Sequence, residues 1–423
     1  MHTLTVLPPK AGPKEELTAP NMIASLIHPE RKASIWTVAF SPDGARLFTA
    51  GYPSGIVQFW DVASCTEVRR IDTPPGLRSS AGYALLTPDW KTLYVPVEKR
   101  TVKPFARDGK RLFRIEEAGE VRVWDVDSGK EKEPLRPANG TAPISARLAP
   151  GGRFLVCVER PGYETSESRP QDITEVWDLA AGKKWKLYDG LASSPCFTPD
   201  GRTVAVRLYD YQSKASAVKL LEPATGNELA TLACQEKDRY FLVEAVSPDG
   251  SVVAVSQGGK KGAPVEVWFR DARTLEDRGK LVGKGDSERN GWSSGRFTPE
   301  GKQFIALDGL GNALVWDVAG RRLERTLPLG GARAAWQLAV SPDGKTLAVG
   351  WAPKADEDLE DQLEPDPQDL PQPRVSLVDL AGDAPARVLV APKGYVGGLA
   401  FSPDGKLLAF GGAGAVHLFE LTK

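Results

Sequence analysis

The sequence predicts an all-β chain built from eight copies of one four-stranded unit, and three observations support this. The 423 residues include 42 glycines and 34 prolines, together about 18% against roughly 12% in ordinary proteins. A turn-forming tetrapeptide recurs eight times, and a strand-like motif follows it each time. This pattern is typical of short strands joined by tight turns and disfavours a helix bundle.

The tetrapeptide has the general form Ser/Thr-Pro-Asp-Gly, and its copies start 43 to 62 residues apart. Proline presets φ at the first corner of a tight turn, aspartate can bond back to the backbone, and glycine takes the left-handed position. Apolar runs flank each copy, so each predicts a β-hairpin. The copies start at Ser41, Thr87, Ala149, Thr198, Ser247, Thr298, Ser341 and Ser402.

The second motif predicts a third strand that ends in a turn. Its clearest copies are QFWDVAS at 58–64, VRVWDVDSG at 121–129, TEVWDLAAG at 174–182 and ALVWDVAG at 313–320. A fourth short strand, such as 67–71, follows. Four antiparallel strands repeated eight times predict an eight-bladed β-propeller. Seven blades are the alternative if the degenerate fourth repeat forms no blade.

These phased motifs resemble the WD-repeat family, in particular its divergent, bacterial-type members, over residues 22–423. The resemblance implies a rigid disc that assembles protein complexes. Typical members carry a Gly-His before the first strand, whose histidine takes part in a hydrogen-bond network with the motif tryptophan. This chain has three histidines, of which only His28 lies near that place. We therefore expect apolar packing to hold most blades.

The ends of the chain predict how the ring closes. The eighth repeat reaches Lys423 without a fourth strand, while the apolar run 22–27 precedes the first hairpin. Pairing 22–27 with 416–421 would remove two exposed edges. We expect residues 1–21 to be a flexible extension and 22–423 to be a single propeller domain.

Composition narrows the function classes. Lys and Arg number 54 and Asp and Glu 55, a formal net charge of -1, which gives no global argument for nucleic acid or membrane binding. No stretch approaches the roughly 18 apolar residues of a membrane span. The four cysteines are too far apart in sequence for a zinc knuckle. We expect buried thiols and a cytoplasmic location.

Insertions predict which face of the ring functions. We name the four strands of each blade a to d, outward from the axis of the ring. One end of the ring then carries the short a–b and c–d turns. The insertions fall in the b–c loops at the other end, and loops on a rigid scaffold often carry function. The blade 2 insertion, 96–119, is basic, and the blade 7 insertion, 351–374, is acidic. We expect a polarised docking face, although two solvated loops would look the same. The charged candidates are Lys99, Arg100, Lys103, Arg107, Asp356, Glu357 and Asp358.

Aromatic residues suggest binding anchors on the same face. Trp36 and Trp336 stand six residues before their turn prolines, in the blades on either side of blade 8, whose equivalent is Gly397. We expect them to frame a gap at the channel mouth, unless they serve only to pack neighbouring blades. Further candidates at about the same level are Trp292, Tyr83, Tyr240 and Tyr395.

Three charges fall within strand a, where apolar residues are expected. Glu244 and Arg296 lie in neighbouring blades with opposite parity, which predicts a structural ion pair between them. Arg147 has no evident partner in the sequence, and we expect it to point into the channel.

The residues that a propeller enzyme needs are scarce. No histidine lies in a metal motif and no serine nucleophile elbow occurs. We therefore predict a non-catalytic scaffold, without cofactor or metal, that binds a protein or peptide as a monomer or as a subunit of a hetero-complex. The alternative is a hydrolase of the lactonase kind with a metal at the channel mouth. Nucleic acid binding through 99–114 is a third and weaker possibility.

Overall fold

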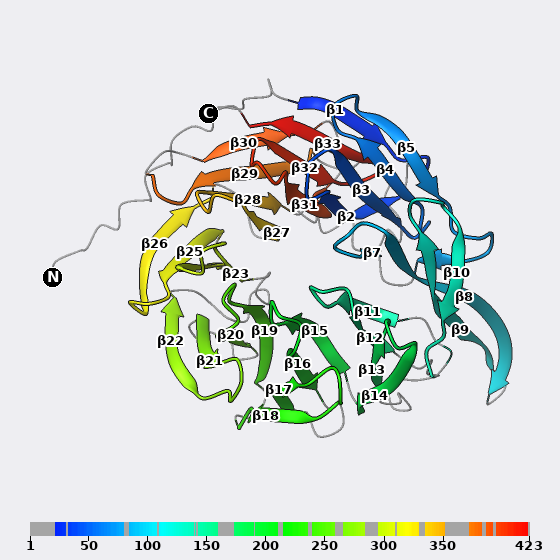
Figure 1. The fold of residues 1–423 in the computed structure, drawn as a ribbon, viewed down its shortest axis with the longest axis horizontal. Helices are drawn as coiled ribbons and strands as arrows, with labels where there is room; N and C mark the ends of the chain where they lie inside the picture. Colours follow the sequence, from blue (N-terminus) through cyan, green and yellow to red (C-terminus); the bar gives the residue numbers. More distant parts are fainter. Residues whose placement is uncertain are drawn as a thin grey trace.

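In the computed structural model, eight antiparallel sheets stand side by side in a ring, which is an eight-bladed β-propeller (Figure 1). The structure describes residues 22–421 apart from 31–32, 80–83, 108–109, 139, 141–142, 160–172, 190, 210–214, 236–238, 259–264, 284–294, 309–310, 330–334, 352–371, 383–385 and 392–394. Over 100–117, and at some other strand positions, it describes the backbone alone. The predicted extension, 1–21, lies outside these residues.

The first half of the ring holds blades 1 to 4. Blade 1 consists of β2 (Ser34–Phe40), β3 (Arg46–Tyr52), β4 (Val57–Asp61) and β5 (Thr66–Ile71). Blade 2 consists of β6 (Arg78–Ser79), β7 (Leu85–Leu86), β8 (Thr92–Arg107), β9 (Lys110–Asp125) and β10 (Glu131–Leu135). Blade 3 consists of β11 (Pro143–Leu148), β12 (Phe154–Glu159), β13 (Ile173–Asp178) and β14 (Lys183–Asp189). Blade 4 consists of β15 (Leu191–Phe197), β16 (Val204–Tyr209), β17 (Ser216–Leu221) and β18 (Glu228–Ala233). The fourth repeat therefore forms a blade of its own.

The second half holds blades 5 to 8. Blade 5 consists of β19 (Tyr240–Val246), β20 (Val252–Gly258), β21 (Val265–Asp271) and β22 (Asp277–Gly283). Blade 6 consists of β23 (Arg296–Phe297), β24 (Gln303–Leu307), β25 (Asn312–Asp317) and β26 (Arg322–Pro328). Blade 7 consists of β27 (Ala335–Val340), β28 (Thr346–Trp351), β29 (Arg374–Asp379) and β30 (Arg387–Val390). Blade 8 consists of β31 (Gly398–Phe401), β32 (Leu407–Gly411), β33 (Ala415–Glu420) and β1 (Met22–Ile27).

The ring closes as predicted. Strand β1 pairs antiparallel with β33, and its register runs from Met22 opposite Phe419 to Ile27 opposite Ala415. The chain then crosses to blade 1, where Ile35 N–H donates to Gly412 O at 2.9 Å. Leu26 and Val416 belong to the same buried cluster as Trp60 of blade 1. Closure therefore covers the apolar face of the first blade as well as the edge of the last.

Apolar packing between neighbouring blades forms the core. The described residues group into eight buried clusters, and each cluster joins two adjacent blades. The cluster between blades 1 and 2, for example, contains Phe48 and Phe59 from one blade and Leu93 and Trp124 from the other. Strands buried on both faces explain why the inner strands read as continuous apolar runs.

The tetrapeptides form tight turns, and the turns also touch one another around the ring. In blade 5, Val252 N–H donates to Ser247 Oγ at 2.9 Å, and Ser251 N–H donates to Asp249 Oδ1 at 3.0 Å. Gly250 has a φ of 71°, and a Cβ there would lie 3.3 Å from Pro199 of the preceding blade. Glycine is therefore required for conformation and for close approach.

Hydrogen bonds of the motif tryptophans are local and differ between blades. Trp60 Nε1 donates to Thr49 Oγ1 at 3.1 Å in blade 1. Blade 7 has no motif tryptophan on its third strand, and there Trp351 on β28 donates at 2.8 Å to Ser376 on β29. His28 is buried in the connection between β1 and β2, where its Nδ1 lies 3.1 Å from Glu30 N.

The blade 2 insertion is a β-ribbon rather than a loop. Strands β8 and β9 continue in register from Thr92 opposite Asp125 to Arg107 opposite Lys110. The ribbon projects away from the ring (Figure 1). The expected insertion loop, 96–119, therefore extends the b–c hairpin. The possible short helix at 355–364 lies outside the described residues, among which no helix is long and apolar enough to cross a membrane.

Candidate functional site on the b–c/d–a face

Trp36 occupies a β-bulge at the start of strand a in blade 1. Ile35 pairs with Gly51 and Thr37 with Ala50, so Trp36 has no residue opposite it. Blade 7 has the same bulge, because Ala335 pairs with Trp351 and Gln337 with Gly350. This leaves Trp336 as the bulged residue. A bulge re-aims a side chain out of the regular pleat, so the two tryptophans singled out by their spacing share one backbone feature.

The ring of Trp36 packs on Tyr395, which precedes strand a of blade 8. The two ring centroids lie 5.9 Å apart at an interplanar angle of 40°. Both residues are partly buried, so the pair contributes to the joint between blades 8 and 1 while keeping some exposed surface. Burial raises the pKa of the Tyr395 phenol, and a hydrogen bond with Ser34 opposes that shift. The phenol is therefore neutral at physiological pH.

The expected gap at Gly397 is not present on the Trp36 side. Gly397 is buried, and a Cβ on it would lie 2.4 Å from the carbonyl oxygen of Ile35. A Cβ on Gly398 would lie 2.9 Å from the carbonyl oxygen of Trp36. These glycines let the innermost strands of blades 8 and 1 approach closely, and Tyr395 occupies the place next to Trp36.

Tyr240 belongs to an aromatic clamp that the sequence did not reveal. The Arg207 guanidinium carbon lies 4.9 Å from the Tyr240 ring centroid and 5.3 Å from that of Tyr209. Arg207 and Tyr209 are on β16 and Tyr240 is on β19, so the clamp joins blades 4 and 5. Cation–π contacts of this kind stabilise a joint between elements. The alternating pattern of VAVRLY (204–209) places Arg207 and Tyr209 on the same face of β16. It could have indicated the clamp only if the residue that faces them in the neighbouring blade were known.

The basic ribbon begins at Lys99. Lys99 is exposed and opposite Ala118, while Glu98 next to it forms an ion pair with Arg78 at 3.3 Å. Arg100, Lys103 and Arg107 follow on β8 in register with Glu117, Arg114 and Lys110. The structure describes their backbone only.

Several predicted site residues lie outside the described part of the chain. They are Tyr83, Trp292, Asp356, Glu357 and Asp358. Trp336 is described by its backbone alone. Of the predicted set, the described side chains bring together one pair, Trp36 and Tyr395.

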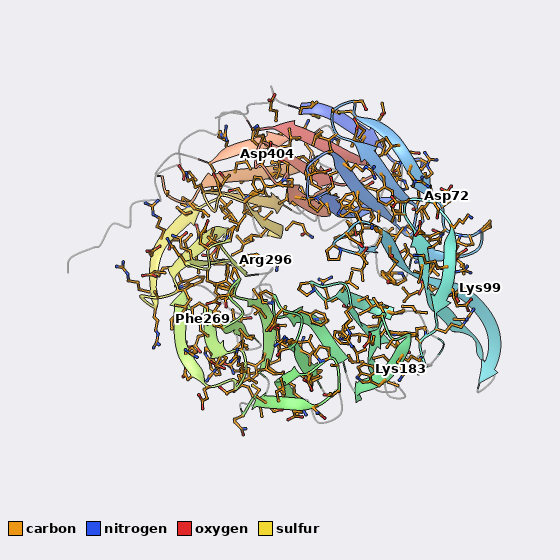
Figure 2. The ribbon with its side chains drawn as sticks, in the orientation of Figure 1. Asp72, Lys99, Lys183, Phe269, Arg296 and Asp404 are labelled. Carbon is orange, nitrogen blue, oxygen red and sulfur yellow. The ribbon has the colours of Figure 1, made fainter. Side chains whose placement is uncertain are left out.

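The ion pair predicted between Glu244 and Arg296 is not formed. Glu244 is buried and its carboxylate accepts hydrogen bonds from Ser256 Oγ and, at 2.9 Å, from Gly295 N–H. Arg296 is exposed and its side chain reaches toward the centre of the ring (Figure 2). A backbone donor from the neighbouring blade thus replaces the expected guanidinium, because the bulge at Glu244 turns its carboxylate into the blade interface.

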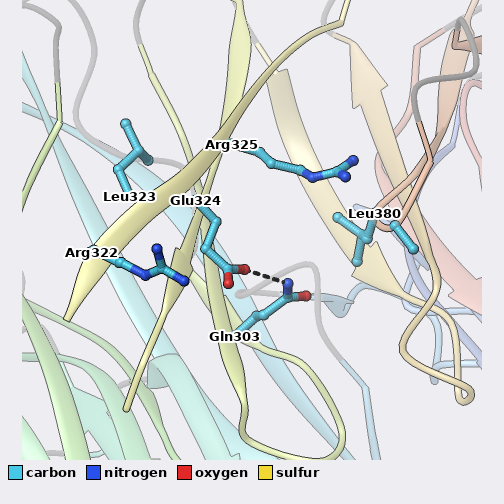
Figure 3. A pocket seen from close by; sticks show the side chains of 7 residues that line it. Gln303, Arg322, Leu323, Glu324, Arg325 and Leu380 are labelled. Carbon is cyan, nitrogen blue, oxygen red and sulfur yellow. Dashed lines mark hydrogen bonds between the residues drawn. The ribbon is translucent and has the colours of Figure 1, made fainter. Parts of the chain in front are cut away.

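The opposite end of the ring carries a polar groove between blades 6 and 7 (Figure 3). Gln303 Nε2 donates to Glu324 Oε2 at 2.8 Å, and Arg325 Nη1 donates to Gly382 O of blade 7 at 2.8 Å. The first bond lies within blade 6, and the second ties blade 6 to blade 7 at the end that the sequence marks as plain. Across the described ranges, no three His, Cys, Asp or Glu residues gather as ligands of a metal ion would.

Comparisons with known proteins agree with this geometry. Residues 22–61, which hold β1 and the first three strands of blade 1, match the family model "WD domain, G-beta repeat". The first repeat of this β-propeller is therefore a WD repeat. The chain is 24% identical over 314 residues to Autophagy-related protein 16 of Arabidopsis thaliana, covering 72% of this chain. The match covers 51% of that protein, so this chain spans about half of its length.

Solved propellers show the same fold at low identity. The C-terminal WD40 domain of Sif2 superposes with a TM-score of 0.64 at 12% identity, covering 95% of this chain and 98% of that one. The Dos1 propeller gives 0.64 at 13%, covering 94% and 95%. The computationally designed Ika8 protein gives 0.64 at 15%, covering 95% and 100%. WD-repeat propellers are generally non-enzymatic scaffolds that bind protein partners, and this chain shares their architecture.

Proposed function

We propose that this WD-repeat propeller is a non-catalytic scaffold that binds a protein or peptide partner on its b–c/d–a face. The observation that carries the proposal is the Trp36–Tyr395 pair. It is set by a bulge at the rim and keeps part of its surface exposed. Partly exposed aromatic residues on a rigid rim are frequent anchors of protein interfaces.

The ribbon β8–β9 extends the b–c hairpin of blade 2, and the proposal assigns the acidic insertion of blade 7 to the same face. In the proposal, Lys99, Arg100, Lys103 and Arg107 give the face a basic arm, and Asp356, Glu357 and Asp358 give it an acidic one. Oppositely charged arms would orient a partner before the aromatic contacts form. The proposed location is the cytoplasm, and the proposed state is a monomer or a subunit of a hetero-complex. Neither cofactor nor metal is required.

The test is affinity capture from lysate of the source cells with three matched proteins. The wild type is compared with a Trp36→Ala/Trp336→Ala variant and with Leu229→Ala, which removes an exposed apolar side chain from the outer strand of blade 4. We expect one near-stoichiometric protein that the wild type and Leu229→Ala retain and the double variant loses. Leu229→Ala should melt like the wild type, and the double variant should still unfold cooperatively, at a lower temperature because the Trp36–Tyr395 contact is lost. A partner that the double variant retains would place the interface elsewhere, and a folded wild type that captures none would contradict the scaffold proposal.

A further inference from the structure

The outer part of the β8–β9 ribbon stands free of the other strands that the structure describes. Strand β6 pairs with β8 no farther out than Glu98, and β10 pairs with β9 no farther out than Val121. Beyond these points β8 and β9 pair only with each other, and Figure 1 shows them projecting away from the ring. A two-stranded ribbon without a third strand or a packing surface is only marginally stable in water. Residues 99–118, the outer ribbon, would therefore gain from a surface that covers them.

The register of the outer ribbon separates its residues into two faces. Residues directly opposite each other share a face, and successive pairs alternate between the faces. The apolar face holds five apolar residues and one arginine, in the pairs Val102–Ile115, Pro104–Phe113 and Ala106–Arg111. The cationic face holds four cations on either side of one apolar pair, as Lys103–Arg114, Phe105–Leu112 and Arg107–Lys110. The outer ribbon is therefore amphipathic.

Positive charge is concentrated in the outer ribbon. Residues 99–114 contain seven Lys and Arg and one Asp, a local charge of +6 in a chain whose formal net charge is -1. On the cationic face, Lys103 lies opposite Arg114, and Arg107 lies opposite Lys110. Like charges directly opposite each other on paired strands are unfavourable. An anionic surface close to these residues would relieve that repulsion.

The two faces favour one class of anionic partner. Nucleic acid supplies phosphates but no apolar interior for the apolar face. Phe105 and Phe113 fall on opposite faces, so they cannot form one platform for stacked bases. An anionic lipid bilayer supplies both environments. As with an amphipathic helix, apolar residues enter the boundary between headgroups and acyl chains, and Lys and Arg stay at the level of the charged headgroups.

We propose that the outer ribbon is a membrane-binding arm that lays its apolar face into the surface of an anionic lipid bilayer. The cations of the outer ribbon draw it to the bilayer, and the ring stays in water beside it. This contact is peripheral and goes beyond the protein partner proposed for the b–c/d–a face. It does not depend on Trp36 or Trp336.

The test is co-sedimentation of the full chain with vesicles of phosphatidylcholine that contain phosphatidylserine as about one third of the lipid. Vesicles of phosphatidylcholine alone are the neutral comparison. We expect the wild type to bind the anionic vesicles about tenfold more tightly or better. Added salt should weaken this binding, because it screens the headgroup charge. Equal binding to both kinds of vesicle would overturn the proposal.

Two variants test the two faces separately. Lys103→Gln/Arg107→Gln/Lys110→Gln/Arg114→Gln removes the charge of the cationic face and should weaken binding to the anionic vesicles about hundredfold. Phe113→Ser/Ile115→Ser keeps every charge and should weaken binding about fivefold or more, because less apolar surface enters the bilayer. Unchanged binding in either variant would contradict the part assigned to that face.

A matched control removes four exposed cations from the a–b and c–d turns at the opposite end of the ring. It is Lys130→Gln/Arg202→Gln/Arg273→Gln/Lys302→Gln. This variant has the same net charge as the cationic-face variant and should bind within about threefold of the wild type, because distant charges are screened. Equal losses in the two variants would show that overall charge governs binding and would overturn the assignment to the outer ribbon.

Deleting the outer ribbon separates loss of binding from misfolding. Glu98 lies opposite Gly119, so an Asn-Gly turn in place of residues 99–118 can close the hairpin at that pair. The shortened chain should unfold cooperatively like the wild type and lose vesicle binding, whereas Trp36→Ala/Trp336→Ala should retain it. Vesicle binding by the shortened chain would overturn the proposal. A wild type that binds polyuridylate or polyglutamate but not these vesicles would overturn it too.

Discussion

His417 Nδ1 lies 3.0 Å from Ser25 Oγ, and this contact joins the strand that closes the ring to the strand it covers. His417 is 4% exposed, and its ring packs 5.4 Å from that of Phe410. Burial lowers the pKa of His417 to about 4. The closing strand is therefore held beside a neutral imidazole.

The first prediction concerns acid. In the unfolded chain His417 takes up a proton near pH 6.5, whereas in the folded chain it stays neutral down to about pH 4. The unfolded state thus binds more protons in this window, and the free energy of unfolding falls as pH drops from 6.5 to 4. His417 contributes up to about 3 kcal/mol of that loss. Urea titrations at several pH values should show the slope.

His417→Phe is the matched variant. Phenylalanine keeps an aromatic ring beside Phe410 and cannot titrate, so the slope between pH 6.5 and 4 should become shallower. Part of the slope should remain in this variant, because burial lowers the pKa of His28 as well. The aspartates of the turns, such as Asp43 and Asp249, have lowered pKa values. Their contribution to the stability of the fold is therefore lost only at more acidic pH. An unchanged slope in His417→Phe would contradict the assignment.

The second prediction concerns ring closure. Leu26 on β1 is 4% exposed and packs in the cluster between blades 8 and 1. Leu26→Ala should lower the free energy of unfolding by about 2–4 kcal/mol, since it removes buried apolar volume from the joint. Ile23 on the same strand is 48% exposed, and Ile23→Ala should change stability by less than about 0.5 kcal/mol. Equal effects would mean that β1 does not seal the ring.

The third prediction concerns the turn glycines. Gly250→Ala should destabilise the fold by about 1–2 kcal/mol, because the left-handed φ disfavours a side chain and Pro199 is close. A methyl group on Gly151 would have no other heavy atom within 4 Å, and its φ is not positive. Gly151→Ala should therefore be neutral or stabilise by up to about 1 kcal/mol. Thermal unfolding of the two variants would check this, and the reverse order would refute the role given to the turn contact.

The fourth prediction concerns the Trp60–Thr49 hydrogen bond. Thr49→Val leaves the buried Trp60 Nε1 without its acceptor and should cost about 1–3 kcal/mol. The Trp60→Phe/Thr49→Val double variant should cost less than the sum of the two single changes, because no buried donor is then left unsatisfied. Denaturant unfolding of all four proteins measures the coupling. Strict additivity would show that the bond contributes nothing to blade 1.

Local chemistry makes much of the architecture readable from the residues. The turn tetrapeptides mark each a–b hairpin because proline, aspartate and glycine act over a few residues. The apolar run 22–27 can be assigned to β33 because an unpaired edge and an unclaimed strand complement each other. The blade 2 insertion is predicted as a loop, since its many charges mask any alternation over 96–119, yet the backbone continues the ladder there.

The number of blades, the closing strand and the end of the ring that carries insertions follow from the order of the residues, because each depends on contacts within one repeat or on chain order. Which side chains meet between blades follows only from the folded ring. Tyr395 lies beside Trp36, Arg207 lies between Tyr209 and Tyr240, and Gly295 takes the place expected for Arg296 at Glu244. These contacts depend on the angle and separation of neighbouring blades, which summed apolar packing sets and no single repeat encodes.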